Sequence, residues 1–472
     1  MKPLSPFLCC TLLLCLAPAA GAQRTLRVEA GGSIAAAIEK APPGSVIEVE
    51  PGVYKEALTV DTPNITLRGI VRGSERPVLE GSGALNDGVI ASGSPFAMTG
   101  FRIQHYKGNG VTTQGVDGVF LSDLILDDTG LYGVYPVESR NITVTHCTAT
   151  RIKDAALYVG ESNQVVVAYN EVHHNVAGIE IENTNDALVH DNLVYENTAG
   201  ILVFVLPGKV QKEGVRTRVF RNWVVRNNTP NFGDPESIVG GLPHGLGIMV
   251  MGADHTALED NWVKGNDSAG IAVLRLAPEH ADKDPALEPM SDHTRIGFNY
   301  LLGNGQKPHP GVAQSYGGGA DVAWDGTGEN NCADLPDPAT AVGAPLPSCL
   351  ERESGAAPRA GQTAPRPAAA RPSEAVIPAG AAVVRIRGMR YQPRHLEVAR
   401  GETVTWLNED AVTHTVTSGK GTQPSAAPLG SPFLRRGDTY SHAFDEPGRY
   451  EYLCLPHLDQ APMRGATVTV TD

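Results

Sequence analysis

The stretch 156–204, ALYVGESNQVVVAYNEVHHNVAGIEIENTNDALVHDNLVYENTAGILVF, decides the fold of most of this chain because it repeats itself. Each repeat opens on a small residue followed by a short apolar-rich strand. The starts at Gly133, Ala156, Gly178 and Gly200 follow one another at a nearly constant spacing of about 22 residues, which is within the range of solenoid repeats. Between the strands lies the turn pattern N-x-x-x-x-N, which occurs at Asn170/Asn175, Asn192/Asn197, Asn222/Asn227, Asn261/Asn266 and Asn299/Asn304.

A period this short, made of strands and polar turns without helices, indicates stacked coils. Asn141, Asn163 and Asn185 also recur at this period, each opening an apolar alternation. Identical turn residues lie above one another in a stack, so we expect Asn side chains to form hydrogen-bonded ladders. Inward Val, Ile and Leu then form one continuous core, and each coil depends on its neighbours.

An exposed solenoid end needs a cap. The stretch SIAAAIEKAPPG at 33–44 predicts one, a short amphipathic helix with Ser33 at its N-cap. With these features, residues 25–330 resemble a right-handed parallel β-helix of the pectate-lyase-like superfamily. The pattern of repeated residues is similar to that of exported β-helix-repeat proteins, including the copper-associated NosD type. The resemblance implies an all-β domain over 23–350, and members of the superfamily include enzymes as well as binding proteins.

Three residues of the repeat are candidates for a binding or catalytic face. Tyr135, Tyr158 and Glu180 fall in one column, and they point to solvent if Val134 and Leu157 point inward. Aromatic rings beside carboxylates suit polysaccharide binding, and paired acids suit acid–base catalysis. An ordinary solvated strand face is the alternative.

Insertions relative to the regular coil predict a wall on one side of the solenoid. They lie at about 206–214, at 229–247 (TPNFGDPESIVGGLPHGLG) and at about 275–291. The polar candidates that they carry are His244, Glu279, His280 and Asp282.

The segment 1–22 reads as a secretory signal peptide, with one basic residue, an apolar stretch and small residues at Ala20 and Ala22. A membrane anchor is one alternative, but the apolar run is short and interrupted by proline, and a lipid-modified Cys15 is another. We expect no transmembrane segment and a periplasmic or secreted protein. The formal net charge of −14 argues against a nucleic-acid partner.

The four cysteines beyond this segment divide into three groups. Cys332 and Cys349 flank a proline-rich loop and could form a disulfide in an oxidising compartment, but the sequence leaves open whether they do. Cys147 lies in an alternating apolar run, which favours a buried inert thiol. Cys454 is not assigned to a disulfide, so in an exported protein its thiol is either reactive or bound by something else.

The composition changes after residue 350. Residues 351–375 are rich in Ala and Pro and predict an extended linker. Alternating strands and polar turns return over 376–472, which fits a small β-sandwich. This last segment carries ten Lys/Arg and ten Asp/Glu, so the acidic excess belongs mainly to the repeats.

Side chains of metal-ligand type occur in this last segment at strand ends. A set of two His and one Cys with a weak axial Met is typical of a type 1 copper centre. Zinc also accepts Cys and His, but it rarely takes Met. His395 and His442 are interpreted as surface residues. The predicted ligands are His414, Cys454, His457 and Met463.

The segment resembles the cupredoxins, especially amicyanin, plastocyanin and pseudoazurin, in GETVTWLNEDAVTHTV, EPGRYEYLC, C-L-P-H and MRG. The resemblance implies a Greek-key β-sandwich with one copper ion. His414, Cys454 and His457 match its equatorial ligands, and Met463 matches the axial one. One departure is the loop HLDQAP, which makes the connection between His457 and Met463 longer than in the familiar members.

The sequence is compatible with three functions. The first is copper-based electron transfer with a redox partner protein, in which the β-helix is a scaffold or binds a ligand. The second is a carbohydrate-active β-helix enzyme of lyase or epimerase type with an accessory copper domain. The third is a copper-binding or delivery factor. The sequence leaves open whether the β-helix is catalytic.

Overall fold

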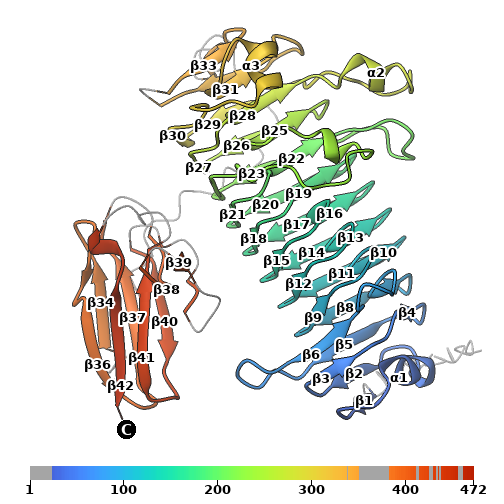
Figure 1. Ribbon diagram of the computed structural model, residues 1–472, viewed down its shortest axis with the longest axis vertical. Coiled ribbons are helices and arrows are strands. Elements are labelled where there is room, and N and C mark those ends of the chain that lie inside the picture. The colour runs from blue at the N-terminus through green and yellow to red at the C-terminus, as the bar shows by residue number, and fades with distance from the viewer. Residues whose placement is uncertain are drawn as a thin grey trace, which may run out of the picture.

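A computed structural model describes residues 24–336, 339–349, 382–410, 414–421, 423–424, 429–431, 434, 437–454 and 461–471. The signal peptide expected at 1–22 and the linker expected at 351–375 lie outside the described residues. The described N-terminal part consists of three long sheets whose strands pair in parallel, coil upon coil (Figure 1). The predicted parallel β-helix is therefore confirmed.

The first sheet of the solenoid has twelve strands. Its strands are β1 (Thr25–Val28), β2 (Val46–Val49), β5 (Ile65–Gly69), β8 (Phe96–Thr99), β11 (Asp117–Ser122), β14 (Arg140–Thr145), β17 (Asn163–Ala168), β20 (Asn185–His190), β23 (Arg218–Phe220), β26 (Ala257–Glu259), β29 (Arg295–Gly297) and β32 (Cys332–Asp334). Arg140 pairs with Asn163, and Asn163 pairs with Asn185. Asn141 therefore lies one position outside the predicted asparagine column, because the coil between β14 and β17 is longer by a single position than the coil that follows it.

The other two sheets complete each coil. The eleven-stranded sheet contains β4 (Leu58–Val60), β7 (Val89–Ala91), β10 (Val111–Gln114), β13 (Val134–Val137), β16 (Ala155–Gly160), β19 (Ala177–Glu182), β22 (Ala199–Phe204), β25 (Leu246–Met251), β28 (Ala269–Leu274), β31 (Ala320–Trp324) and β33 (Ala341–Gly343). The ten-stranded sheet contains β3 (Gly52–Tyr54), β6 (Pro77–Glu80), β9 (Arg102–Gln104), β12 (Ile125–Asp127), β15 (Thr148–Thr150), β18 (Glu171–His173), β21 (Leu193–Tyr195), β24 (Trp223–Val225), β27 (Trp262–Lys264) and β30 (Tyr300–Leu302).

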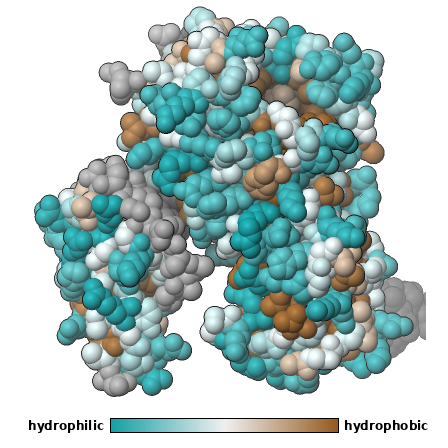
Figure 2. Space-filling model, viewed as in Figure 1, coloured by the Kyte–Doolittle hydropathy of each residue, from teal (hydrophilic) through white to brown (hydrophobic). Residues whose placement is uncertain are grey.

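Apolar side chains stack inside the coils as the repeat predicts. Leu157, Ile179 and Ile201 lie in one column, and all three are buried. The face seen in Figure 2 is mainly hydrophilic, and its apolar residues form separate patches. The stack of coils thus buries its aliphatic side chains along a continuous interior.

Two asparagine ladders hold the turns between the sheets. Asn192 accepts hydrogen bonds from the backbone N–H and the side-chain amide of Asn170, both at 3.0 Å. It donates in turn to the Val167 carbonyl at 2.8 Å and to Asn222 at 2.9 Å. The second ladder repeats this arrangement through Asn175, Asn197, Asn227, Asn266 and Asn304. These amides satisfy backbone groups that would otherwise be buried without partners.

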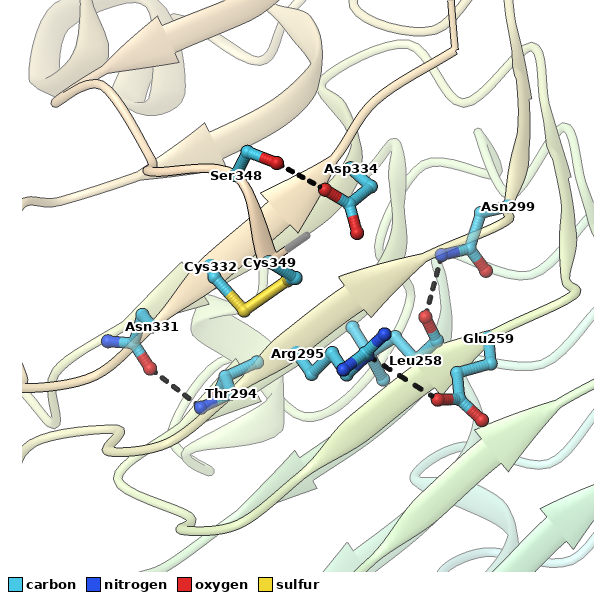
Figure 3. The surroundings of a disulfide bond; sticks show 10 residues. All are labelled: Leu258, Glu259, Thr294, Arg295, Asn299, Asn331, Cys332, Asp334, Ser348 and Cys349. Carbon is cyan, nitrogen blue, oxygen red and sulfur yellow. Dashed lines mark hydrogen bonds and ion pairs between the residues drawn. A yellow bond between two sulfur atoms is a disulfide. The ribbon is translucent and has the colours of Figure 1, made fainter. Parts of the chain in front are cut away.

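Both ends of the solenoid carry local caps. The predicted helix is α1 (Ile34–Lys40), and the Ser33 hydroxyl accepts a hydrogen bond from the Ala36 N–H at 3.1 Å. At the other end, a disulfide, which the sequence had left open, joins Cys332 of β32 to Cys349 (Figure 3). In the same segment, the Ser348 hydroxyl donates to Asp334 at 2.7 Å.

Reduction of this disulfide is expected to loosen the last coil while the inner coils stay folded. Closing a loop of this length contributes about 3 kcal/mol. We expect proteases to cut residues 335–349 faster after reduction and alkylation, with little change in far-ultraviolet circular dichroism. Equal cleavage rates before and after reduction would show that neighbouring contacts alone hold this segment.

The three insertions pack on the outer face of the eleven-stranded sheet. Leu206, Leu242 and Leu287 from the three insertions belong to one apolar cluster with Tyr158 and Leu202 of that face. The remaining short helices lie in the loops of this end of the solenoid: η1 (Val239–Gly241), α2 (Pro278–Ala281) and α3 (Pro310–Tyr316).

The structure contradicts the prediction that Tyr135, Tyr158 and Glu180 are exposed to solvent. The column is right, since Tyr158 pairs with Glu180 on the outer face. The exposure is wrong, because Tyr158 is 1% and Glu180 5% exposed, while Tyr135 is half-buried. Side chains from the insertions cover the face.

The C-terminal part forms two sheets in non-consecutive strand order, as a Greek-key sandwich requires. Trp406 and Tyr452 lie in the core between the sheets. One sheet contains β35 (Tyr391–Gln392), β34 (Ala382–Ile386), β37 (Thr403–Asn408) and β40 (Thr439–Ala443). The other contains β36 (His395–Ala399), β42 (Ala466–Thr471), β41 (Gly448–Leu453), β38 (Thr417–Lys420) and β39 (Gln423–Pro424).

Candidate metal centre

Two neighbouring strands of the sandwich bring His414 and Cys454 together. Cys454 directly follows β41, and His414 lies shortly before β38. These strands pair antiparallel, with Thr417 opposite Leu453. Side chains that are far apart in sequence thus come into contact, at 3.5 Å between the His414 Nδ1 and the Cys454 Sγ.

The sulfur of Cys454 is buried and accepts a backbone hydrogen bond. The Thr415 N–H donates to Sγ at 3.3 Å, and both Cys454 and His414 are 0% exposed. A backbone donor aimed at sulfur stabilises a thiolate, which is the form of cysteine that binds metals.

The ring of His414 is oriented by Asp410. The Nε2 of His414 lies 2.9 Å from the Asp410 carboxylate, which also accepts the Met389 N–H at 2.9 Å and the Gly388 N–H at 2.6 Å. Burial opposes ionisation of Asp410, but these hydrogen bonds outweigh it and lower its pKa. We place the ring proton on Nε2 because that nitrogen faces the carboxylate, which leaves the lone pair of Nδ1 directed at the sulfur.

Burial lowers the pKa of His414 more than Asp410 raises it. The imidazole is therefore neutral at pH 7, as a metal ligand must be.

Met463 belongs to the same buried core as Cys454. It ends the short helix η3 (Ala461–Met463), just before β42, and is 0% exposed. Its carbonyl accepts the Cys454 N–H at 2.7 Å. This bond closes the loop between the two residues and fixes where the methionine enters the core.

Three of the four predicted ligands thus lie near one another, but their contacts differ. His414 and Cys454 are in contact, and Met463 is joined to Cys454 through its backbone. His457 lies outside the described residues. Within the described part of the chain, no group of three or more His, Cys, Asp and Glu is arranged to hold a metal ion. The donors present are a thiolate, an imidazole and a thioether, and this set suits copper.

Two further features of this centre were missed by sequence reasoning. Asp410 stands four positions before His414, and this spacing was the available signal for its role. The contact between the Thr415 N–H and sulfur has no sequence signal, since any residue except proline supplies a backbone donor.

The two histidines interpreted as surface residues contact other groups. His395 is exposed and its Nδ1 lies 2.8 Å from the Thr467 hydroxyl. His442 is half-buried and packs edge-on against Phe444, with ring centroids 4.8 Å apart.

The polar candidates of the β-helix insertions do not form one site. His244 packs edge-on against His309, with ring centroids 5.3 Å apart. Glu279 and His280 lie on α2, where Asp282 is the C-cap. No hydrogen bond, ion pair or ring contact joins His244 to these three residues in the described part of the chain.

Comparison with known proteins finds two families in this chain. The family described as "Right handed beta helix region" matches residues 87–230, and "Copper binding proteins, plastocyanin/azurin family" matches residues 379–471. Amicyanin of Paracoccus denitrificans is 35% identical over 119 residues, which cover 25% of this chain and 90% of that protein. Plastocyanin of Scenedesmus fuscus is 35% identical over 89 residues, covering 17% and 85%.

A solved structure of a mutant amicyanin in the Cu(I) form is 36% identical. The alignment covers 21% of this chain and 90% of that one, with a TM-score of 0.18.

Among the described residues, no helix is long and apolar enough to cross a membrane.

Proposed function

Because the chain belongs to the plastocyanin/azurin family of copper-binding proteins through its C-terminal domain, we propose that it holds one type 1 copper ion and transfers electrons to and from a partner protein. His414, Cys454 and His457 would be the equatorial ligands, and Met463 the axial one. The observation that carries this proposal is the buried contact between the His414 Nδ1 and the Cys454 Sγ, at 3.5 Å.

The chain's own residues prepare the centre before any metal binds. The Thr415 N–H stabilises the thiolate, and Asp410 holds the imidazole with its lone pair toward the sulfur. Both ligands are withdrawn from water. By orienting the two ligands, these contacts would limit reorganisation between oxidation states. Copper supplies a one-electron Cu(II)/Cu(I) couple when it is bound.

Export remains part of the proposal. A disulfide between Cys332 and Cys349 persists in oxidising compartments, which supports a periplasmic or secreted location. The signal peptide at 1–22 and the linker at 351–375 would then deliver the protein and tether the copper domain to the β-helix. N-terminal sequencing of the secreted protein, with a first residue near position 23, tests this part.

A redox titration of the copper-loaded full chain tests the function. We expect the visible absorption to bleach on reduction and return on reoxidation, as a single one-electron transition, with the copper content unchanged after several cycles. Loss of copper to an external chelator during the cycles would favour a delivery factor. A colourless protein that binds zinc would contradict electron transfer.

A further inference from the structure

A second polar cluster lies far from the copper ligands in sequence, on the outer face of the eleven-stranded sheet. Glu180 and Glu182 of β19 project from this face, since Ile179 and Ile181 are packed in the interior. Asp154 precedes β16 of the same sheet, and its carboxylate adds to the effect of burial in raising the pKa of Glu180. We call these three acids, together with the three tyrosines and the lysine described below, the acid–tyrosine cluster.

Three tyrosine rings form the aromatic part of the cluster. The ring centroids of Tyr132, Tyr135 and Tyr158 are 4.6 to 4.7 Å apart in every pair. The Tyr158 hydroxyl donates a hydrogen bond to Glu182 at 2.7 Å. The carboxylates therefore lie against a compact aromatic surface.

The insertion that follows β22 contributes one cation. The Lys209 Nζ lies 3.0 Å from Glu182. Burial alone would lower the pKa of Lys209, but the attraction of Glu182 outweighs it and raises the pKa. The chain itself thus places an alkylammonium group in this cluster, beside carboxylates and tyrosines.

Glu180 is the acid that this lysine leaves unpaired. Its side chain is more than nine-tenths buried, yet it makes no hydrogen bond or ion pair with any described residue. The charged groups that act on it are Asp154, Glu182 and Lys209. With all three carboxylates ionised, one lysine would leave two negative charges uncompensated, and buried carboxylates are costly without a partner.

We propose that the acid–tyrosine cluster is a binding site for a primary alkylammonium ligand, with the Glu180 carboxylate as its counterion. The three N–H groups of the ligand would donate to the free oxygens of the cluster, and the tyrosine rings would attract the cation and pack on its alkyl chain. The ion pair between Lys209 and Glu182 is an example of an alkylammonium group bound by this cluster.

A metal ion is a poorer match to the same residues. No group of three or more His, Cys, Asp and Glu in the described part of the chain has the geometry to hold one. A neutral sugar would not compensate the excess negative charge. The experiment described below distinguishes binding of a metal ion or a sugar from binding of an amine.

Proton release provides a readout that a purely structural role would not change. Burial, followed by the neighbouring Asp154 and Glu182 carboxylates, raises the pKa of Glu180 well above its usual range. Burial also raises the pKa of Asp154, to about 6. These influences favour the protonated form of Glu180 in the free protein, whereas a bound cation favours its ionised form. Binding should release a proton, and affinity should increase with pH by at most about tenfold per unit for each proton released.

Calorimetric titration of the full-length protein with butylamine, compared with butan-1-ol, tests the proposal. We expect butylamine to bind more tightly at pH 8 than at pH 6, with a heat that depends on the ionisation enthalpy of the buffer. Glu180→Gln should weaken binding at least tenfold. Glu171→Gln is the matched control, because Glu171 is also buried enough to raise its pKa but accepts the Tyr195 hydroxyl at 2.9 Å on another sheet.

Several results would overturn the proposal: no binding of butylamine, equal binding of butan-1-ol, unchanged affinity in Glu180→Gln, or binding of calcium, zinc or an oligosaccharide that Glu180→Gln abolishes in place of amine binding. Loss of binding through unfolding of the variant is distinguished by its Tm. When folding raises the pKa of an acid, the folded protein loses stability as pH rises. The Tm of Glu180→Gln at pH 8 should therefore not fall below that of the wild type.

Discussion

Cys454→Ser is expected to abolish the intense blue absorption band of the copper-loaded protein. That band arises from charge transfer between a thiolate and Cu(II), and a serine hydroxyl cannot replace the thiolate. The Thr415 N–H, now 3.3 Å from sulfur, would face a neutral oxygen. The measurement is the visible spectrum of wild type and variant after addition of Cu(II), with copper content determined in parallel.

Cys147→Ala is the matched control, because Cys147 is likewise outside the disulfide among the described residues and is equally buried. Burial raises the pKa of its thiol to about 12, so it is not a thiolate at neutral pH. Its variant should keep the full blue band, and so should His395→Ala. A band that survives in Cys454→Ser would place the copper elsewhere and remove the basis for the proposed ligand set.

Asn192→Ala is expected to destabilise the β-helix by about 3–5 kcal/mol, a large effect for one substitution. The variant loses four side-chain hydrogen bonds and leaves the backbone N–H of Asn170 and the Val167 carbonyl without those partners in the interior. Each coil is stabilised mainly by its neighbours, so the damage should spread to adjacent coils. Urea denaturation followed by circular dichroism measures the shift in midpoint.

Hydrogen exchange gives a local test of the same prediction. The amide of Asn170 should lose protection more than amides of distant coils, because its acceptor is the Asn192 side chain. Asn86→Ala is the control, since Asn86 is exposed and its side-chain amide donates a 3.3 Å hydrogen bond to the neighbouring Asp87 carboxylate. Its midpoint should stay close to that of the wild type. Equal effects of the two substitutions would show that the ladder contributes little to stability.

The sequence predicted the solenoid well because its information is local and repeated. The same inward positions, such as Leu157, Ile179 and Ile201, recur in each coil, and a parallel stack is the arrangement that buries them all. The same reasoning was wrong about the exposure of Tyr158 and Glu180. Their column follows from the period, but their burial depends on insertions from later coils.

The candidate copper ligands were accessible to sequence reasoning for a different reason. His414, Cys454 and Met463 are uncommon side-chain types at strand ends, and the resemblance to cupredoxins names their roles. The supporting shell was not accessible in the same way. Asp410 and Thr415 act through a carboxylate that orients an imidazole and through a backbone N–H aimed at sulfur.

By itself, the sequence determined the all-β architecture, the asparagine ladders and the predicted copper ligands, and it left open whether Cys332 and Cys349 pair. Periodicity and residue type are properties of the chain that need no knowledge of contacts. Only the tertiary structure decided that Glu180 is buried near Lys209 with no hydrogen bond or ion pair to any described residue, and that Thr415 donates to Cys454. These facts depend on which distant segments pack together, and packing is set by the whole fold rather than by the local pattern.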